Sequence, residues 1–169
     1  VQANVRSRSF SIARGVKQGD PISALLFIAV MQDLCGQLTC RWAAANRRRK
    51  GIKFGIDVNS DTDGGCLTNL RFADDVVLVA QTKNDIRKML NSVAARASHY
   101  GLKINLDKTK VLTWDHLASG CKSLQVGTSA VQILGEAEAE KHLGRKLCFK
   151  DHQETELQHR IAAAWSAFH

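Results

Sequence analysis

Two adjacent aspartates, Asp74 and Asp75, lie between two apolar segments in the stretch NLRFADDVVLVA of residues 69–80. In a regular strand, neighbouring side chains point to opposite faces, so these carboxylates could not share a ligand. At the tip of a tight hairpin, both can reach the same solvent-facing edge. There they would suit a hard cation such as Mg²⁺, and two such ions promote phosphoryl transfer. Asp is also common in ordinary polar turns, so the dipeptide alone leaves both interpretations open.

The chain is long enough for one domain and is strongly basic. Its composition, with 44% hydrophobic and 24% charged residues among 169, is that of a globular protein. Lys and Arg number 24 against 16 Asp and Glu, which gives a formal net charge of +8. This balance favours contact with polyanions such as nucleic acid, although charge alone does not separate nucleic acid from an anionic membrane surface.

Apolar runs and cysteines narrow the class of protein. The longest apolar run, residues 24–31, is far shorter than the ~20 residues of a membrane span, so we expect no membrane partner. Five scattered cysteines without a C-x-x-C pair predict reduced thiols in an intracellular protein. A looser zinc pattern pairs His116 with Cys121 and Cys148 with His152, but its spacings miss the usual ligand pairs, and ordinary thiols and imidazoles are favoured.

The aspartates require a framework of helices and hairpins to position them. Asp20 can cap a helix that starts at Pro21, and we expect this helix to be deeply buried because residues 25–31 are apolar nearly all round. Residues 51–58 and 66–72 flank a turn-rich segment and predict a hairpin. The strand after Asp75 would pair back on residues 69–72.

Further elements follow from periodicity and turn residues. Residues 82–101 predict an amphipathic helix, with Asn84 as candidate cap and Gly101 as stop. Strand candidates and a final helix complete the pattern: 102–114, 122–126, 130–134 and 142–149 as strand segments, and 154–169 as a helix with Leu157, Ile161, Trp165 and Phe168 on one face. The fold class is therefore α+β, with helices on one face of a mostly antiparallel sheet. Trp42, Trp114 and Trp165 lie in or beside apolar runs, which assigns them to the core.

Four blocks, in this order, resemble the palm of a reverse transcriptase, most closely the type encoded by non-LTR (LINE-like) retrotransposons. The blocks are RGVKQGDPISALLF (residues 14–27), FADD (72–75), GLKINLDKTKVL (101–112) and HLG (142–144). Ala24 departs from the family pattern, which has proline there. The stretch RIAAAWSAF resembles the opening helix of the family's thumb, so the resemblance covers residues 3–168.

The resemblance implies a domain organisation. Residues 1–150 would form a partial palm that lacks the fingers and the first catalytic aspartate motif, and residues 151–169 would start a thumb-like helix. Residues 1–14 contain no Asp or Glu, so we expect the chain to begin downstream of that motif. Because two-metal chemistry needs carboxylates on both sides of the metals, the chain alone is expected to be nearly or wholly inactive.

The resemblance also assigns catalytic roles to matching residues. Asp74 and Asp75 would bind the catalytic Mg²⁺, with Mn²⁺ as a possible substitute; Asp74 would be the direct ligand and Asp75 would support it. Lys108 would protonate or neutralise the leaving pyrophosphate, a role that a flexible cation fits. The alternative for Lys108 is a solvated lysine in a turn, and both interpretations stay open.

Other matched residues would contact nucleotide and nucleic acid. Gln18 and Gly19 would contact template and nucleotide, and Phe72 would lie beside the incoming nucleotide or the primer end. Leu143 and Gly144 would belong to the primer grip. A glycine at position 19 also fits a plain turn before a capped helix, and both roles can hold together. The basic residues 47–50 could touch phosphates, but a solvated helix end is the favoured interpretation.

The implied function is that of an RNA-directed DNA polymerase in retrotransposition. It would transfer nucleotides from dNTPs to the 3′-OH of a DNA primer on an RNA template. The resemblance places such a protein inside the cell, in the nucleus or in a cytoplasmic ribonucleoprotein. The alternative is a non-catalytic retroelement remnant that at most binds nucleic acid, and the oligomeric state stays open.

Overall fold

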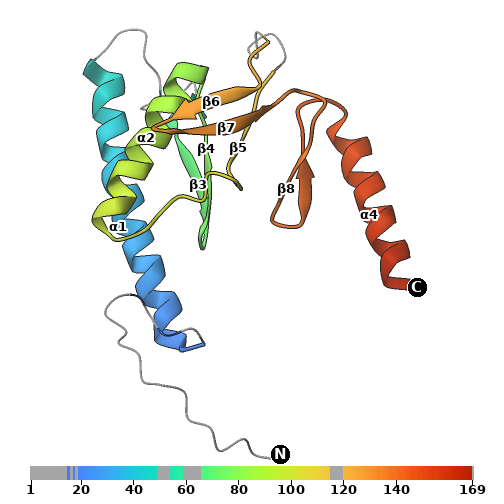
Figure 1. Ribbon diagram of the computed structural model, residues 1–169, viewed down its shortest axis with the longest axis horizontal. Coiled ribbons are helices and arrows are strands. Elements are labelled where there is room, and N and C mark those ends of the chain that lie inside the picture. Colours follow the sequence, from blue (N-terminus) through green and yellow to red (C-terminus); the bar gives the residue numbers. More distant parts are fainter. Residues whose placement is uncertain are drawn as a thin grey trace, which may run out of the picture.

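The computed structural model describes residues 15, 17, 19–48, 54–58, 66–114 and 120–168, which fold into helices and short strands (Figure 1). The helices are α1 (Pro21–Arg48), α2 (Lys83–His99) and α4 (His152–Phe168). The strands are β1 (Ile56–Asp57), β2 (Cys66–Leu67), β3 (Asn69–Phe72), β4 (Asp75–Leu78), β5 (Lys110–Leu112), β6 (Ser123–Val126), β7 (Ser129–Leu134), β8 (Glu140–His142) and β9 (Arg145–Leu147). Helix and sheet are thus mixed, as an α+β class requires.

In the described residues, the strands form several small sheets and not the one continuous sheet that we expected. The pairs β1–β2, β3–β4 and β8–β9 are antiparallel, and a separate sheet has the order β5-β7-β6. Within that sheet β5 runs parallel to β7, and β6 is antiparallel to it. Among the described residues the longest strand is β7, with six residues.

Helix α1 begins where its capping residues predict. The Oδ1 of Asp20 accepts the N–H of Ile22 at 3.0 Å, and Pro21 is the first helical residue. The expected deep burial of the whole helix was wrong, because its first turns expose large apolar side chains. The exposed fractions are 62% for Ile22, 67% for Leu25, 51% for Leu26 and 52% for Ile28.

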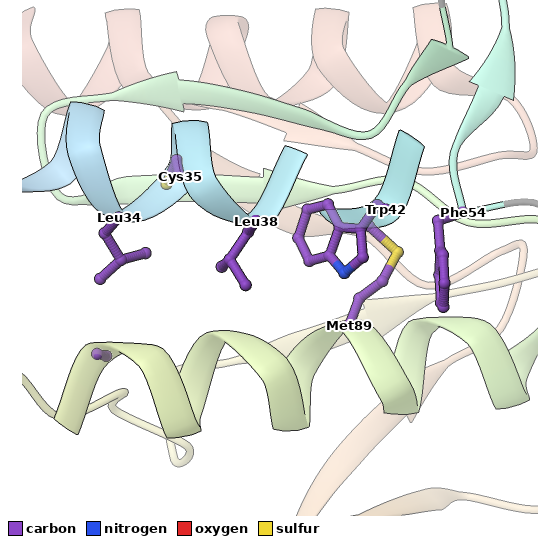
Figure 2. Close-up of a cluster of buried hydrophobic side chains, with 7 residues drawn as sticks. Leu34, Cys35, Leu38, Trp42, Phe54 and Met89 are labelled. Atoms are coloured by element: carbon purple, nitrogen blue, oxygen red, sulfur yellow. The ribbon is translucent and has the colours of Figure 1, made fainter. Parts of the chain in front are cut away.

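The second half of α1 packs against α2 and forms the larger core cluster. Leu34, Leu38 and Trp42 point from α1 towards α2, where Met89 lies, and Phe54 closes one end (Figure 2). The Met89 side chain is fully buried, with an exposed fraction of 0%. Because apolar burial contributes roughly 25 cal/mol per Å², these buried side chains stabilise the contact between the two helices.

Among the described residues, α1 has the length and hydropathy of a membrane-crossing helix. The helix meets this criterion by its mean hydropathy, although its longest uninterrupted apolar run is only residues 24–31. Buried core helices satisfy the same criterion, and the buried residues of α1 are Leu34, Cys35, Leu38 and Trp42.

A second cluster joins α2 to the β5–β7–β6 sheet. Leu90 on α2 packs with buried strand residues, which are Val111, Leu124, Val126, Val131 and Ile133. Leu78 on β4 contacts both clusters, so the hairpin β3–β4 is anchored where they meet. The apolar side chains of α2 therefore face two partners at once.

Three details of the sequence prediction need correction. Helix α2 is capped by Thr82 and not Asn84, because the Thr82 Oγ1 accepts the N–H of Asp85 at 3.1 Å. Trp42 is buried, as predicted, but Trp114 and Trp165 are 44% and 61% exposed. Residues 102–105 are not a strand.

A polar link also ties α1 to the C-terminal end of α2. The Tyr100 hydroxyl donates to the Asp33 carboxylate, and Gln37 donates to the same group at 2.9 Å. These bonds, and more weakly the Arg96 charge, hold the pKa of Asp33 below its ordinary value against the opposing effect of burial.

Replacing Met89 by Ala should lower the free energy of unfolding by about 2–5 kcal/mol, because the cavity opens at the fully buried centre of the α1–α2 contact. Urea unfolding followed by circular dichroism measures this change. Asn91→Ala, at an exposed position of the same helix, should stay near wild type. Equal losses in the two variants would contradict the assignment of Met89 to the core.

Replacing Tyr100 by Phe should destabilise the chain in a pH-dependent way. Since the folded pKa of Asp33 is depressed, the link contributes stability above the unfolded pKa and loses it as pH falls through the folded pKa. The difference between wild type and Tyr100→Phe should therefore be largest near pH 7 and shrink below about pH 4. In an Asp33→Asn background, the effect of Tyr100→Phe should no longer depend on pH.

Candidate metal and nucleotide site

The hairpin β3–β4 carries both aspartates at its tip. Phe72 pairs with Asp75, so Ala73 and Asp74 form the two-residue turn. Ala73 has a φ of 52°, in the left-handed region that residues with a Cβ disfavour. Asp74 and Asp75 are both exposed. Asp74 therefore lies in the turn itself and Asp75 at the first position of β4, both open to solvent.

Helix α1 holds the hairpin along its length. The Nδ2 of Asn69 donates to the Oγ1 of Thr39 at 3.1 Å, and the Nη1 of Arg71 donates to the Oε1 of Gln32 at 2.9 Å. Asn69 and Arg71 share one face of β3 because strand residues alternate. From Asn69 to Arg71 the contacts move from Thr39 to Gln32, towards the N-terminus of α1. The hairpin tip therefore lies near the start of that helix.

An open hollow of about 680 Å³ lies between the hairpin tip and the start of α1. Its lining includes Lys17, Gly19, Asp20, Phe27, Ala73 and Asp74. The structure therefore brings Gly19 and Asp74 together, although they are far apart in the sequence. Asp75 does not line this hollow, which distinguishes the two carboxylates in position.

The turn before α1 is fixed by local bonds. Gly19 has a φ of 87°, and a Cβ added there would meet no atom within 4 Å. Its backbone conformation, and not crowding, therefore favours glycine. The Ser23 Oγ donates to the Lys17 carbonyl at 2.6 Å, which closes the turn onto the helix. Gln18 lies outside the described residues.

The other predicted site residues lie elsewhere. Phe72 is 65% exposed, on the hairpin face opposite Arg71. Lys108 is exposed in a turn, where its N–H donates to the Asn105 Oδ1 at 3.2 Å, and it does not line the hollow. Leu143 is 51% exposed.

Leu143 and Gly144 form the turn of the hairpin β8–β9. Their φ angles are 48° and 79°, which is the pattern of a two-residue turn with both central residues left-handed. In Figure 1 this turn and the β3–β4 turn both lie at the lower ends of their hairpins. Neither Leu143 nor Gly144 lines the hollow.

The donor set at the hairpin tip fits a hard divalent cation in type but is small. Carboxylate oxygens are the ligands that Mg²⁺ and Mn²⁺ prefer. Within the part of the chain that the structure describes, no three His, Cys, Asp or Glu side chains gather closely enough to hold a metal ion. Asp74 and Asp75 are thus a pair of carboxylates without a third ligand side chain close enough, among the described residues, to complete a metal site. His116 of the looser zinc pattern lies outside the described residues.

Sequence reasoning missed several residues that build this site. Lys17 and Phe27 line the hollow, and Arg71 and Gln32 anchor the hairpin to α1. Lys17 and Phe27 belong to the same sequence block as Gly19, so the block match could have indicated them as site residues. Arg71 and Gln32 are 39 positions apart and left no local pattern.

Residues 1–145 match the family described as reverse transcriptase (RNA-dependent DNA polymerase). Because the match covers most of the chain and includes the hairpin and the hollow, this chain belongs to the reverse transcriptase family. The resemblance stated from the four sequence blocks is thereby confirmed.

Curated relatives narrow the kind of reverse transcriptase. The chain is 34% identical over 145 residues to the Pol polyprotein of retrotransposable element R2DM from Drosophila melanogaster, a match that covers 82% of this chain and 12% of that protein. It is 32% identical over 141 residues to the Pol polyprotein of element R2 from Nasonia vitripennis, with 78% and 12% covered. An uncharacterized transposon-derived protein of Caenorhabditis elegans is 40% identical over 106 residues, with 63% and 38% covered. The chain therefore spans well under half the length of these relatives, two of which come from R2 retrotransposable elements.

The two hairpin turns should respond in opposite ways to exchange of Ala and Gly. Ala73→Gly removes a left-handed cost of roughly 1–2 kcal/mol and adds a backbone entropy cost of roughly 0.5–1 kcal/mol. Thermal unfolding should show a net gain in stability of up to about 1.5 kcal/mol. Gly144→Ala, at a position where an added Cβ would meet no atom within 4 Å, should lose about 1 kcal/mol because of the left-handed backbone alone. A loss of stability in Ala73→Gly would show that the described turn conformation is wrong.

Proposed function

We propose that this chain is part of an RNA-directed DNA polymerase that extends a DNA primer on an RNA template during retrotransposition. The observation that supports this most directly is the hollow where Asp74, on the hairpin tip, meets Gly19, on the turn before α1. Family membership supplies the reaction class, and the hollow brings two of the family's sequence blocks together. Residues 1–150 would form a partial palm and residues 151–169 the start of a thumb helix.

Asp74 and Asp75 would hold Mg²⁺, and Mn²⁺ could replace it. The bound ions would neutralise developing charge on the phosphates and activate the primer hydroxyl. Asp74 would be the direct ligand because it lines the hollow, and Asp75 would add negative potential beside it. The hairpin orients both groups in advance, since it is anchored to α1 through Asn69 and Arg71.

The remaining residues would bind the nucleic acid and the nucleotide. Gly19 leaves room for a template base or dNTP to approach the backbone, because no side chain fills that space. Phe72 would pack against the nucleotide or primer end with its exposed ring. Lys108 would neutralise pyrophosphate once template and fingers bring it near, and Leu143 and Gly144 would hold the primer strand.

A second candidate function is a retroelement remnant that binds nucleic acid without catalysis. It is favoured by the small donor set: within the described residues, no third His, Cys, Asp or Glu side chain lies close enough to share a metal ion with the two aspartates. The net charge of +8 would suffice for salt-dependent binding. For either function, we propose an intracellular location in the nucleus or a cytoplasmic ribonucleoprotein.

Primer extension separates the two functions. The chain should be fused behind the fingers and first palm segment of a family member and assayed with Mg²⁺, a DNA primer and an RNA template. Extension should occur, and Asp74→Asn should lower its rate at least about a hundredfold, because several kcal/mol of charge stabilisation are lost.

Glu154→Gln, which removes an exposed charge on α4, is the matched control and should retain full activity. Extension that survives Asp74→Asn, or a folded fusion with no extension, would refute the polymerase function. Salt-dependent RNA binding without extension would support the remnant.

A further inference from the structure

The joint between the hairpin β8–β9 and helix α4 is built around one buried carboxylate. Glu156 is 6% exposed, although α4 otherwise stands largely apart from the other helices (Figure 1). Its Oε2 accepts the N–H of Lys146 on β9 at 2.8 Å. Its Oε1 accepts the Nε–H of Arg160 at 2.7 Å and lies 3.5 Å from the Nε of Arg145.

This carboxylate satisfies a backbone N–H group on the unpaired edge of β9. Lys146 pairs with Lys141 across the hairpin, but its N–H is directed to Glu156 and not to β8. A helix side chain thus takes the place that a neighbouring strand would have. The Lys146 N–H and the two guanidinium groups hold the pKa of Glu156 below its ordinary value despite burial, so the group is ionised at neutral pH.

The two arginines are held by their inner nitrogens and turned outward. Both contacts with Glu156 use Nε, and the side chains of Arg145 and Arg160 remain 58% and 65% exposed. Within the described residues, the contacts that hold both guanidinium groups run through Nε, on the side away from the terminal nitrogens. A guanidinium group fixed through Nε keeps donors that match the geometry of a phosphate.

We propose that Arg145 and Arg160, oriented by Glu156, form a binding site for the phosphodiester backbone of a nucleic acid strand. Arg145 directly follows the Leu143–Gly144 turn and pairs with His142 across it, so the site lies beside that turn. The inference rests on the proposed function in one respect: the strand bound there is the primer or its template. Glu156 acts as a positioning residue, because it holds both arginines and does not itself contact the strand.

Glu156→Gln tests this site sharply, because a pure net-charge effect and a loss of arginine orientation would change the binding affinity in opposite directions. Removing a negative charge should strengthen binding to an anionic strand if only net charge matters. If Glu156 orients the arginines, Glu156→Gln should weaken binding of an RNA–DNA hybrid about threefold or more. Glu154→Gln removes an equal charge from the same helix, where Glu154 contacts Gln158, and should bind like wild type or slightly more tightly.

Salt dependence provides the second readout, which a merely structural role would not change. The dissociation constant of the full chain for a labelled RNA–DNA hybrid should be measured between about 50 and 200 mM KCl, because affinity from phosphate contacts falls steeply over this range. Arg145→Gln and Arg160→Gln should each weaken binding about 3- to 10-fold and lower the slope of log K against log salt by roughly 0.7–0.9. Arg87→Gln, on α2, should leave the slope unchanged.

Each outcome decides the proposal. Weaker binding in Glu156→Gln, with reduced slopes in both arginine variants, supports it. Wild-type binding in Glu156→Gln, unchanged slopes, or no hybrid binding by the wild-type chain would overturn it. Should Glu156→Gln fail to fold by circular dichroism, the two arginine variants decide by themselves. The polymerase proposal is judged separately by Asp74→Asn, because this assay involves no nucleotide transfer.

Discussion

The packing of α1 against α2 is the constraint on which the rest of the structure depends. Its centre, Met89, is fully buried between the helices, and Leu78 of the hairpin β3–β4 packs against the same cluster. Hydrogen bonds from Asn69 and Arg71 then align the hairpin with α1. Asp74 at the tip thus reaches the start of α1, where Gly19 and Lys17 also line the hollow. The apolar contact of α1 with α2 therefore fixes the position of the hollow, which lies at the other end of α1.

Features that depend on residues close together in the sequence could be predicted. The start of α1 followed from Asp20 and Pro21, since a cap and a helix-compatible proline act over one turn. The pairing of β3 with β4 followed from two apolar runs around a two-residue turn. The α2 cap was misassigned because Thr82 and Asn84 both suit the position, and the reciprocal bond with Asp85 decides between them.

Tertiary contacts were beyond prediction from the chain alone. An all-round apolar segment indicates burial, yet the first turns of α1 are exposed because no described element covers them. The final helix shows the reverse of the usual arrangement: the stripe of Leu157, Ile161, Trp165 and Phe168 faces outward, and polar Glu156 faces β9. Nothing in a single helical pattern marks Glu156 as buried, because its partners lie on a separate hairpin. Likewise, no local pattern predicts that Gly19 and Asp74 line the same hollow, because their proximity depends on how the hairpin packs along α1.

A divalent cation held at the β3–β4 tip, as proposed above, would lie against the turn before α1. The most direct measurement is paramagnetic broadening of the amide signals of the labelled chain on titration with Mn²⁺. We expect broadening centred on residues 72–75 and extending to Gly19, and its reversal by excess Mg²⁺. Broadening centred elsewhere, or equally strong broadening at residues 72–75 in Asp74→Asn, would contradict it.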